Sequence, residues 1–85
     1  MNLHEAAKAG NMTVGDLARE ELKRYRVSLL RLTDLEMERV AANVYGQKMS
    51  KGQVADVIRD VTGRKVNLVE RGHETWIQAE YPEGN

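Results

Sequence analysis

The side chains best suited to do chemistry are cations that gather in one part of the chain, residues 48–71. This part carries six Lys and Arg side chains against three acids, a local charge of +3, whereas the whole chain has 13 of each sign. Lysine and arginine bind phosphate oxygens through charge-assisted hydrogen bonds. The excess is typical of a surface that binds an anion, although a chance excess on a solvated face explains the same count. The six cations are Lys48, Lys51, Arg59, Arg64, Lys65 and Arg71.

The segment SKGQVADVIRDVTGRK, residues 50–65, begins with side chains that can bind phosphate and read bases. Ser50 is a helix-capping residue, and its hydroxyl and the free N–H groups of a helix start could hold a phosphate. Lys51 and Gln53 carry the amine and amide groups that match the edges of guanine and adenine. Gly52 between them would allow close approach of the backbone. We therefore expect a nucleic-acid contact at the start of this helix.

Acidic side chains on the same helix point to a different partner. With its valines turned inward, the helix directs Asp56, Arg59 and Asp60 outward. Aspartates on that face would repel phosphate, although a carboxylate can accept a hydrogen bond from cytosine. Lys51 and Arg59 only balance the two aspartates, and a mixed-charge face suits a contact with another protein equally well.

Catalytic and metal-binding chemistry has little support in the sequence. His4 and His73 lie far apart, and Ser28 and Ser50 have no local partner that would activate a nucleophile. There is no cysteine, which excludes a disulfide framework and a thiolate zinc site. We expect no catalytic residue, no metal ligand and no cofactor; His73, in an expected turn, would join phosphate contacts only when protonated.

The bulk composition indicates one small globular domain. The chain has 85 residues, of which 41% are apolar, enough for a packed core. The absence of cysteine fits a reducing cytosol, and no apolar run reaches the length of a membrane span. We therefore expect a cytoplasmic protein that does not enter a membrane.

Four capping residues, each followed three positions later by an acid or amide, predict where helices begin. The first opens only a turn or two before Gly10, so residues 1–12 are expected to form an N-terminal arm. Apolar residues at helical spacing follow the other three and predict helices over 14–25, 34–45 and 50–62. The four pairs are Asn2 with Glu5, Thr13 with Asp16, Thr33 with Glu36, and Ser50 with Gln53.

Three further segments have the composition of strands. RVSLLRL, residues 26–32, is a short, partly β-branched run and is interpreted as a short strand. Residues 65–70 and 74–81 alternate in polarity around a turn glycine and predict a hairpin. Residues 82–85 are expected to form a disordered tail.

This order of elements resembles the winged helix-turn-helix superfamily, whose last hairpin is the wing. SKGQVADVIRDVTGRKV is similar to its third helix and first wing strand, and the resemblance covers residues 13–81. It implies an α+β fold, a three-helix bundle followed by a C-terminal β-hairpin. It also implies a dimeric transcriptional regulator on double-stranded DNA, with helix 50–62 in the major groove and the 65–81 hairpin as wing. The expected contacts are Lys48, Ser50, Lys51, Gln53, Arg59, Arg64, Lys65 and Arg71.

Two alternatives stay open. SKGQVADV followed by VTGRKVNLVERG also resembles the paired helices of phage-repressor-type domains, in which residues 62–71 would be a recognition helix and the hairpin would not exist. The second alternative concerns function. The domain could be a small adaptor or inhibitor that docks on a larger protein through its mixed-charge helix face.

Overall fold

The structure is a computed structural model, and it describes residues 1–82. The elements run in the order α1 (Leu3–Ala9), α2 (Val14–Arg24), α3 (Asp34–Val44), α4 (Lys51–Thr62), β1 (Val66–Arg71) and β2 (Glu74–Ala79). Four helices followed by an antiparallel hairpin confirm the expected α+β class. Of the tail expected over 82–85, Pro82 is exposed and the other three residues lie outside the described part.

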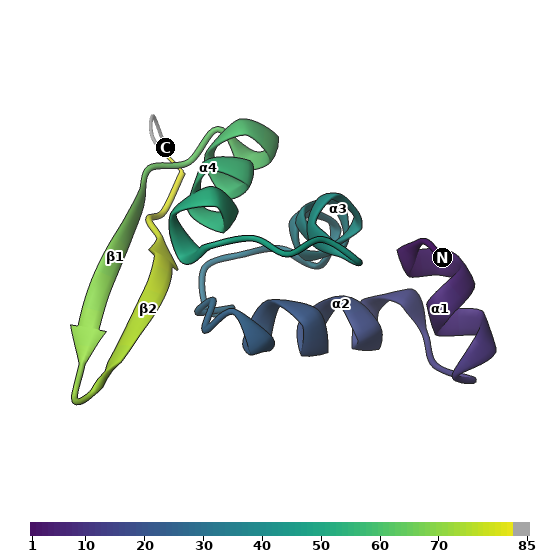
Figure 1. Ribbon diagram of the computed structural model, residues 1–85. Coiled ribbons are helices and arrows are strands. Elements are labelled where there is room, and N and C mark those ends of the chain that lie inside the picture. Colours follow the sequence, from purple (N-terminus) through teal and green to yellow (C-terminus); the bar gives the residue numbers. More distant parts are fainter. Residues whose placement is uncertain (83–85) are drawn as a thin grey trace.

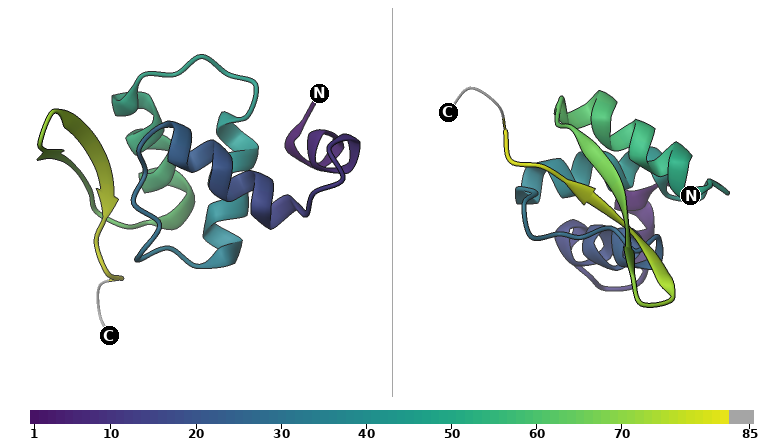
Figure 2. Two further views of the ribbon diagram at one scale, coloured as in Figure 1. Left: turned by 90° about the horizontal axis from the view of Figure 1, so that it is seen from below. Right: turned by 90° about the vertical axis from the view of Figure 1, so that its left-hand side faces the viewer.

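The helices and the hairpin form a flat molecule, with principal extents of 36 × 33 × 18 Å. The hairpin stands beside α4 at one end, and α1 lies at the opposite end near the N-terminus (Figure 1). Helices α2, α3 and α4 occupy the space between them, as the two further views also show (Figure 2). The hairpin therefore flanks the helices on one side of the molecule.

All four predicted helix starts are confirmed by their caps. The side chains of Asn2, Thr13, Thr33 and Ser50 each accept a hydrogen bond from the backbone N–H three residues later. In α1, α3 and α4 the side chain at that later position bonds back to the cap, which completes a capping box. Each cap contributes about 1 kcal/mol and acts within one helical turn, which is why the sequence alone locates it.

The core joins the three longer helices to the hairpin. Leu22 of α2, Val40 of α3, Ile58 of α4 and Ile77 of β2 are all fully buried. Of the apolar stripe expected on α4, Val54 and Ile58 are buried whereas Val57 and Val61 are only half-buried. The hairpin thus covers apolar surface of α4 and is part of the core.

The N-terminal segment differs from the expected arm. Within it, α1 packs against α2 and α3, and the side chains of Leu3 and Ala7 are buried. The short length of this helix led to the expectation of an arm. Burial of Leu3 supplies the tertiary packing that a helix of seven residues needs.

The hairpin is present, which excludes the repressor-like alternative. Its strands end one or two residues away from the expected bounds. β1 pairs with β2 from Val66 opposite Ala79 to Arg71 opposite Glu74, and Gly72 takes a left-handed conformation in the turn. The recognition helix expected at 62–71 in the repressor-like alternative is wrong, because α4 ends at Thr62 and residues 66–71 form β1. In β1, the β-branched residues Val66 and Val69 pair with Ala79 and Trp76 of β2, and the side chain of Val66 is buried.

The strand expected over 26–32 is wrong except at one residue. Val27 forms an isolated parallel bridge with Ile77, through Ser28 N–H to Ile77 O (2.8 Å) and Ile77 N–H to Arg26 O (2.9 Å). Leu30 and Arg31 then form a turn, and the guanidinium of Arg31 lies 4.5 Å from the ring centre of Tyr81. This run contributes two separate buried side chains to the core, those of Val27 and Leu32.

Candidate nucleic-acid interface

The first turn of α4 is joined to the hairpin by Lys51. Its ammonium group is half-buried and donates a hydrogen bond to the carbonyl oxygen of Thr75, close to the hairpin turn. The start of α4 and the tip of the hairpin are thereby held on one side of the molecule. Because its charged end is occupied within the chain, Lys51 fixes this arrangement and is poorly placed to read a base.

Ser50 and Gln53 bond to each other at the exposed start of α4. The N–H of Gln53 donates to Ser50 Oγ (3.2 Å), and the N–H of Ser50 donates to Gln53 Oε1 (2.8 Å). The Nε2 group of Gln53 makes no hydrogen bond within residues 1–82. Its two donors therefore face solvent, whereas Ser50 is used as the helix cap.

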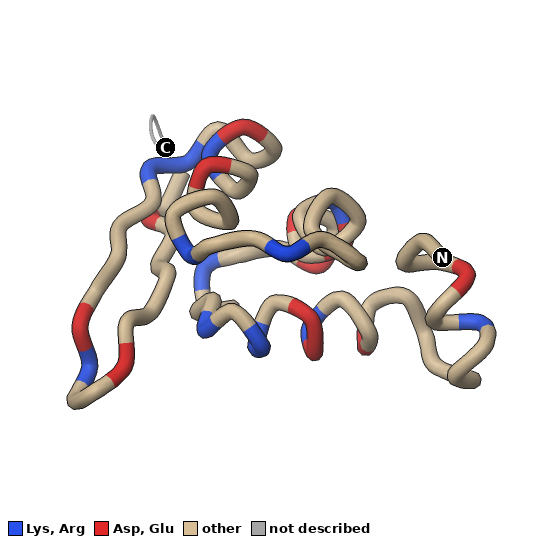
Figure 3. Tube along the Cα trace, in the orientation of Figure 1, with Lys and Arg blue, Asp and Glu red and all other residues tan. Residues whose placement is uncertain are grey.

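Arg59 is tied down on the outer face of α4. Its guanidinium donates to Asp56 Oδ1 (2.7 Å) and to the carbonyl oxygen of Val66 (2.8 Å). The side chain stays 45% exposed, but its charge is compensated by the aspartate. Figure 3 shows both signs of charge on α4, on α2 and on the hairpin.

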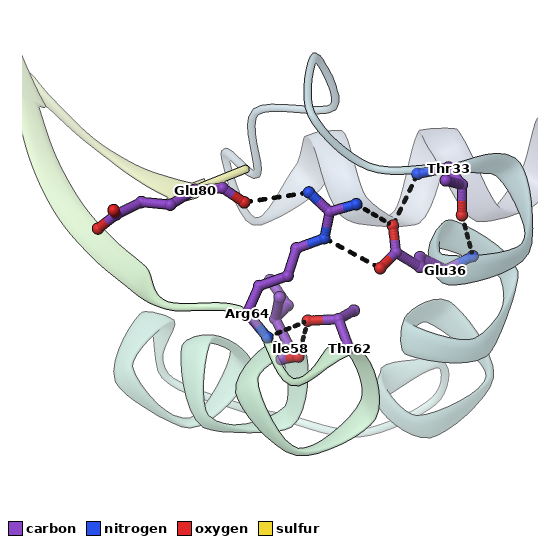
Figure 4. Close-up of polar contacts among 6 residues, drawn as sticks. All are labelled: Thr33, Glu36, Ile58, Thr62, Arg64 and Glu80. Carbon is purple, nitrogen blue, oxygen red and sulfur yellow. Dashed lines mark hydrogen bonds and ion pairs between the residues drawn. The ribbon is translucent and has the colours of Figure 1, made fainter. Parts of the chain in front are cut away.

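Arg64 lies in the interior and connects three elements (Figure 4). Its Nε and Nη2 donate to the carboxylate of Glu36 (3.0 and 2.8 Å), and Nη1 donates to the carbonyl oxygen of Glu80 (3.0 Å). The side chain is 6% exposed, so this arginine holds α3, the end of α4 and the end of β2 together. It is not available to a phosphate group in this conformation.

The environment of Glu36 favours its charged form. Burial alone would raise the pKa of its carboxyl group, but the hydrogen bonds from Arg64 and from the N–H of Thr33 outweigh it, and the pKa is lowered from its ordinary value of 4.5. The Arg64–Glu36 contact is therefore an ion pair at neutral pH. Because both side chains lie close to the core, removal of either one would leave the other charge without its partner, which is strongly destabilising.

The other expected contact residues lie at the surface. Lys48 is exposed on the loop between α3 and α4, and Lys65 is exposed between α4 and β1. Arg71, at the hairpin turn, donates to Gln78 Oε1 (3.0 Å) and places its guanidinium 5.7 Å from the ring centre of Trp76. His73 is exposed in the turn. Arg71 and His73 share the hairpin tip, which Lys51 ties to the start of α4.

The fold also assembles a second basic cluster that the sequence did not reveal. An open groove of about 730 Å³ lies between α2, the segment after it and the outer face of the hairpin; we call it the α2–hairpin groove. Its members are separated by up to 57 positions, from Arg19 to Trp76, so no local pattern connects them. It is lined by Arg19, Lys23, Arg26, Val27, Ser28, Leu29, Leu30, Met37, Arg71 and Trp76.

The described residues offer no cluster of three or more His, Asp or Glu side chains that could hold a metal ion. Nor is any helix within residues 1–82 long and apolar enough to cross a membrane. No protein-family model, no curated protein and no solved structure matches the chain. The order of four helices and a hairpin is compatible with the winged-helix topology.

Proposed function

We propose that this protein is a winged-helix regulator of transcription that binds duplex DNA. The first turn of α4 enters the major groove, and the tip of the hairpin lies on the adjoining backbone. The observation that carries the proposal is the hydrogen bond from Lys51 to the Thr75 carbonyl oxygen, which joins those two parts. A helix start and a wing tip on one side are what such a DNA contact needs.

The start of α4 suits a phosphate better than the start of any other described helix. The first turns of α1, α2 and α3 each contain an acid, whereas that of α4 contains none. The exposed Gly52 lies in this turn, and a Cβ there would meet only Ser50 Oγ at 3.8 Å. Neither packing nor backbone conformation therefore requires a glycine, and the bare backbone leaves room for a phosphate at the N–H groups.

The contact residues are fewer than the sequence predicted. Lys48, Lys65 and Arg71 are the exposed cations proposed to contact phosphates, and the free amide of Gln53 is the proposed base reader. Lys51 and Arg64 hold the elements in place. Since so few contacts give weak binding by one copy, we propose that two copies act together on adjacent half-sites.

The test is a titration of the protein with duplexes selected from a random pool, followed by fluorescence anisotropy at increasing salt. We expect affinity to fall with salt, with a logarithmic slope of about 0.9 for each phosphate contact. Lys48→Ala should reduce that slope by about one contact's worth. Lys8→Ala on α1, at the far end of the molecule, is the matched control and should leave the slope unchanged.

Two results would contradict the proposal: a flat salt dependence, and the absence of binding to any selected duplex at low salt. Equal effects of Lys48→Ala and Lys8→Ala would show that the loop before α4 is not part of the DNA interface. The α2–hairpin groove supports contact with a protein as a second function of the domain.

A further inference from the structure

The α2–hairpin groove combines an apolar floor with a basic rim. Val27 and Met37 are buried beneath it, while Leu30 beside it is 85% exposed, an unusual position for a large aliphatic side chain. No acid lines the groove. Tryptophan, methionine and arginine are the side chains enriched where proteins bind one another.

The backbone of Arg26, which lines the groove, adopts a strained left-handed conformation. Helix α2 ends with the N–H of Val27 bonded to Leu22 O (3.0 Å) and that of Arg26 bonded to Lys23 O (2.9 Å), the pair of bonds that defines a Schellman ending. The residue in the left-handed position of this ending is ordinarily glycine. Here it is Arg26, at φ 62°. A costly conformation kept by a non-glycine residue points to a use for its side chain.

The contacts of Arg26 within the chain do not account for that cost. Its guanidinium pairs with Glu74 Oε2 (3.0 Å), but both side chains are 48% exposed, and ion pairs in such positions add little stability. It also lies 6.0 Å from the ring centre of Trp76. Arg26 is also one of the residues that line the groove.

The charges of the rim favour a ligand with a few carboxylates. Lys23 makes no ion pair within the described residues, and Arg71 bonds to a neutral amide, so both charges are uncompensated. Arg19 and Arg26 share their charge with acids outside the groove: Asp16, Asp34 and Glu74.

A nucleic acid fits the groove less well than a peptide. Single strands bind basic grooves by stacking bases on exposed aromatic rings. The ring of Trp76 is only half-exposed, and the guanidinium groups of Arg26 and Arg71 lie over it at 6.0 and 5.7 Å. The partial compensation of the rim charges also weakens attraction for a polyanion.

We propose that the α2–hairpin groove binds a short acidic peptide segment of a partner protein. An aliphatic side chain of the segment packs against Leu30 and the apolar floor, and carboxylates on either side of it pair with Lys23 on α2 and with Arg71 on the hairpin. Arg26, which also lines the groove, donates to the same carboxylates or to the peptide backbone.

The experiment uses the fluorescence of Trp76, the single tryptophan of the chain, as the reporter. One set of blocked peptides carries Leu or Ile flanked by Asp and Glu, and a matched set carries Asn and Gln in place of the acids. A single-stranded oligonucleotide is the third probe. We expect the acidic set alone to shift the emission of Trp76, and amide NMR signals of residues 23–30 and 71–76 to move with it.

Two variants test the assignment to this groove. Arg26→Gly relieves the left-handed strain, so it should fold with an equal or higher melting temperature and still bind the acidic peptides at least about tenfold more weakly. Lys23→Glu should weaken them similarly. Lys48→Glu lies outside the groove and should leave peptide affinity unchanged.

The proposal fails if no acidic peptide shifts Trp76, if the neutral set binds equally well, or if the oligonucleotide binds more tightly than any peptide. Unchanged affinity in Arg26→Gly would also overturn it. Arg71 belongs to both proposed surfaces, so the two proposals are separated through Lys48, which takes no part in the groove. A smaller salt slope of DNA binding in Lys48→Ala, with intact peptide binding, is the result that separates them.

Discussion

At the scale of single residues, Arg64 shows how burial redefines a cation. In the sequence it stands among the basic residues of a presumed DNA surface. In the structure its donors are used by Glu36 and the backbone of Glu80, and its side chain is 6% exposed. The same guanidinium chemistry that would bind a phosphate instead binds a carboxylate of the protein itself.

We predict that Arg64→Ala lowers the free energy of unfolding by about 3 kcal/mol, because it leaves Glu36 without its partner close to the core. Urea denaturation at neutral pH measures this change. Arg39→Ala, on the exposed side of α3, is the control and should leave stability nearly unchanged. An equal, small effect of both variants would show that the ion pair does not support the fold.

A pH dependence follows from Glu36 as well. Its pKa is lower in the folded than in the unfolded chain, so its contribution to stability is complete above the ordinary value of 4.5 and is lost as the pH falls through the lowered value. Denaturation curves from neutral to acidic pH should show this loss. Glu36→Gln should be less stable at neutral pH, and its stability should fall less on acidification.

At the scale of elements, two glycines with opposite uses lie in the first turn of α4 and at its C-cap. Gly63 ends the helix in the left-handed conformation, at φ 70°, whereas Gly52 has no positive φ and no close neighbour that would exclude a side chain. The first is required by the backbone. The second lowers the stability of the helix, and we propose that it serves the contact with DNA.

We predict that Gly52→Ala raises the free energy of unfolding by about 0.5 kcal/mol, because alanine favours a helix more than glycine does. The same change should weaken DNA binding, since the added methyl group lies at the proposed phosphate site. Gly63→Ala is the matched comparison and should destabilise the domain by about 1 kcal/mol. Tighter DNA binding by Gly52→Ala would contradict the close approach.

At the scale of the whole molecule, α1 is part of the domain and closes one end of its core. Leu3 is 1% exposed and belongs to the same cluster as Leu22 and Val40. A chain of 85 residues buries a small share of its surface, so each large core side chain matters. The N-terminal residues therefore cannot be treated as a separate arm.

We predict that Leu3→Ala lowers the free energy of unfolding by about 3 kcal/mol, as expected for a cavity at a fully buried leucine. Met1→Ala, at a residue that is 81% exposed, should have almost no effect. Thermal unfolding followed by circular dichroism compares the two. Similar melting temperatures would show that α1 is only loosely attached.

The sequence by itself determined the helix starts, the end of α4 and the hairpin, because these depend on neighbours within a few positions. The capping bonds of α1 to α4 all join residues three apart, and the hairpin strands are separated only by a two-residue turn. The interval 26–32 differs from the expected strand because it forms a single bridge to Ile77.

Only the tertiary structure decided which cations are exposed and which are held by bonds to distant parts of the chain. The bond from Lys51 spans 24 positions and that from Arg64 to Glu36 spans 28, so neither can be inferred from local spacing. The α2–hairpin groove arises in the same way, from side chains of α2 and β2 that the fold brings together. Long-range packing is set by the sum of many weak contacts, and it alone fixes whether a charge meets solvent or a partner within the chain.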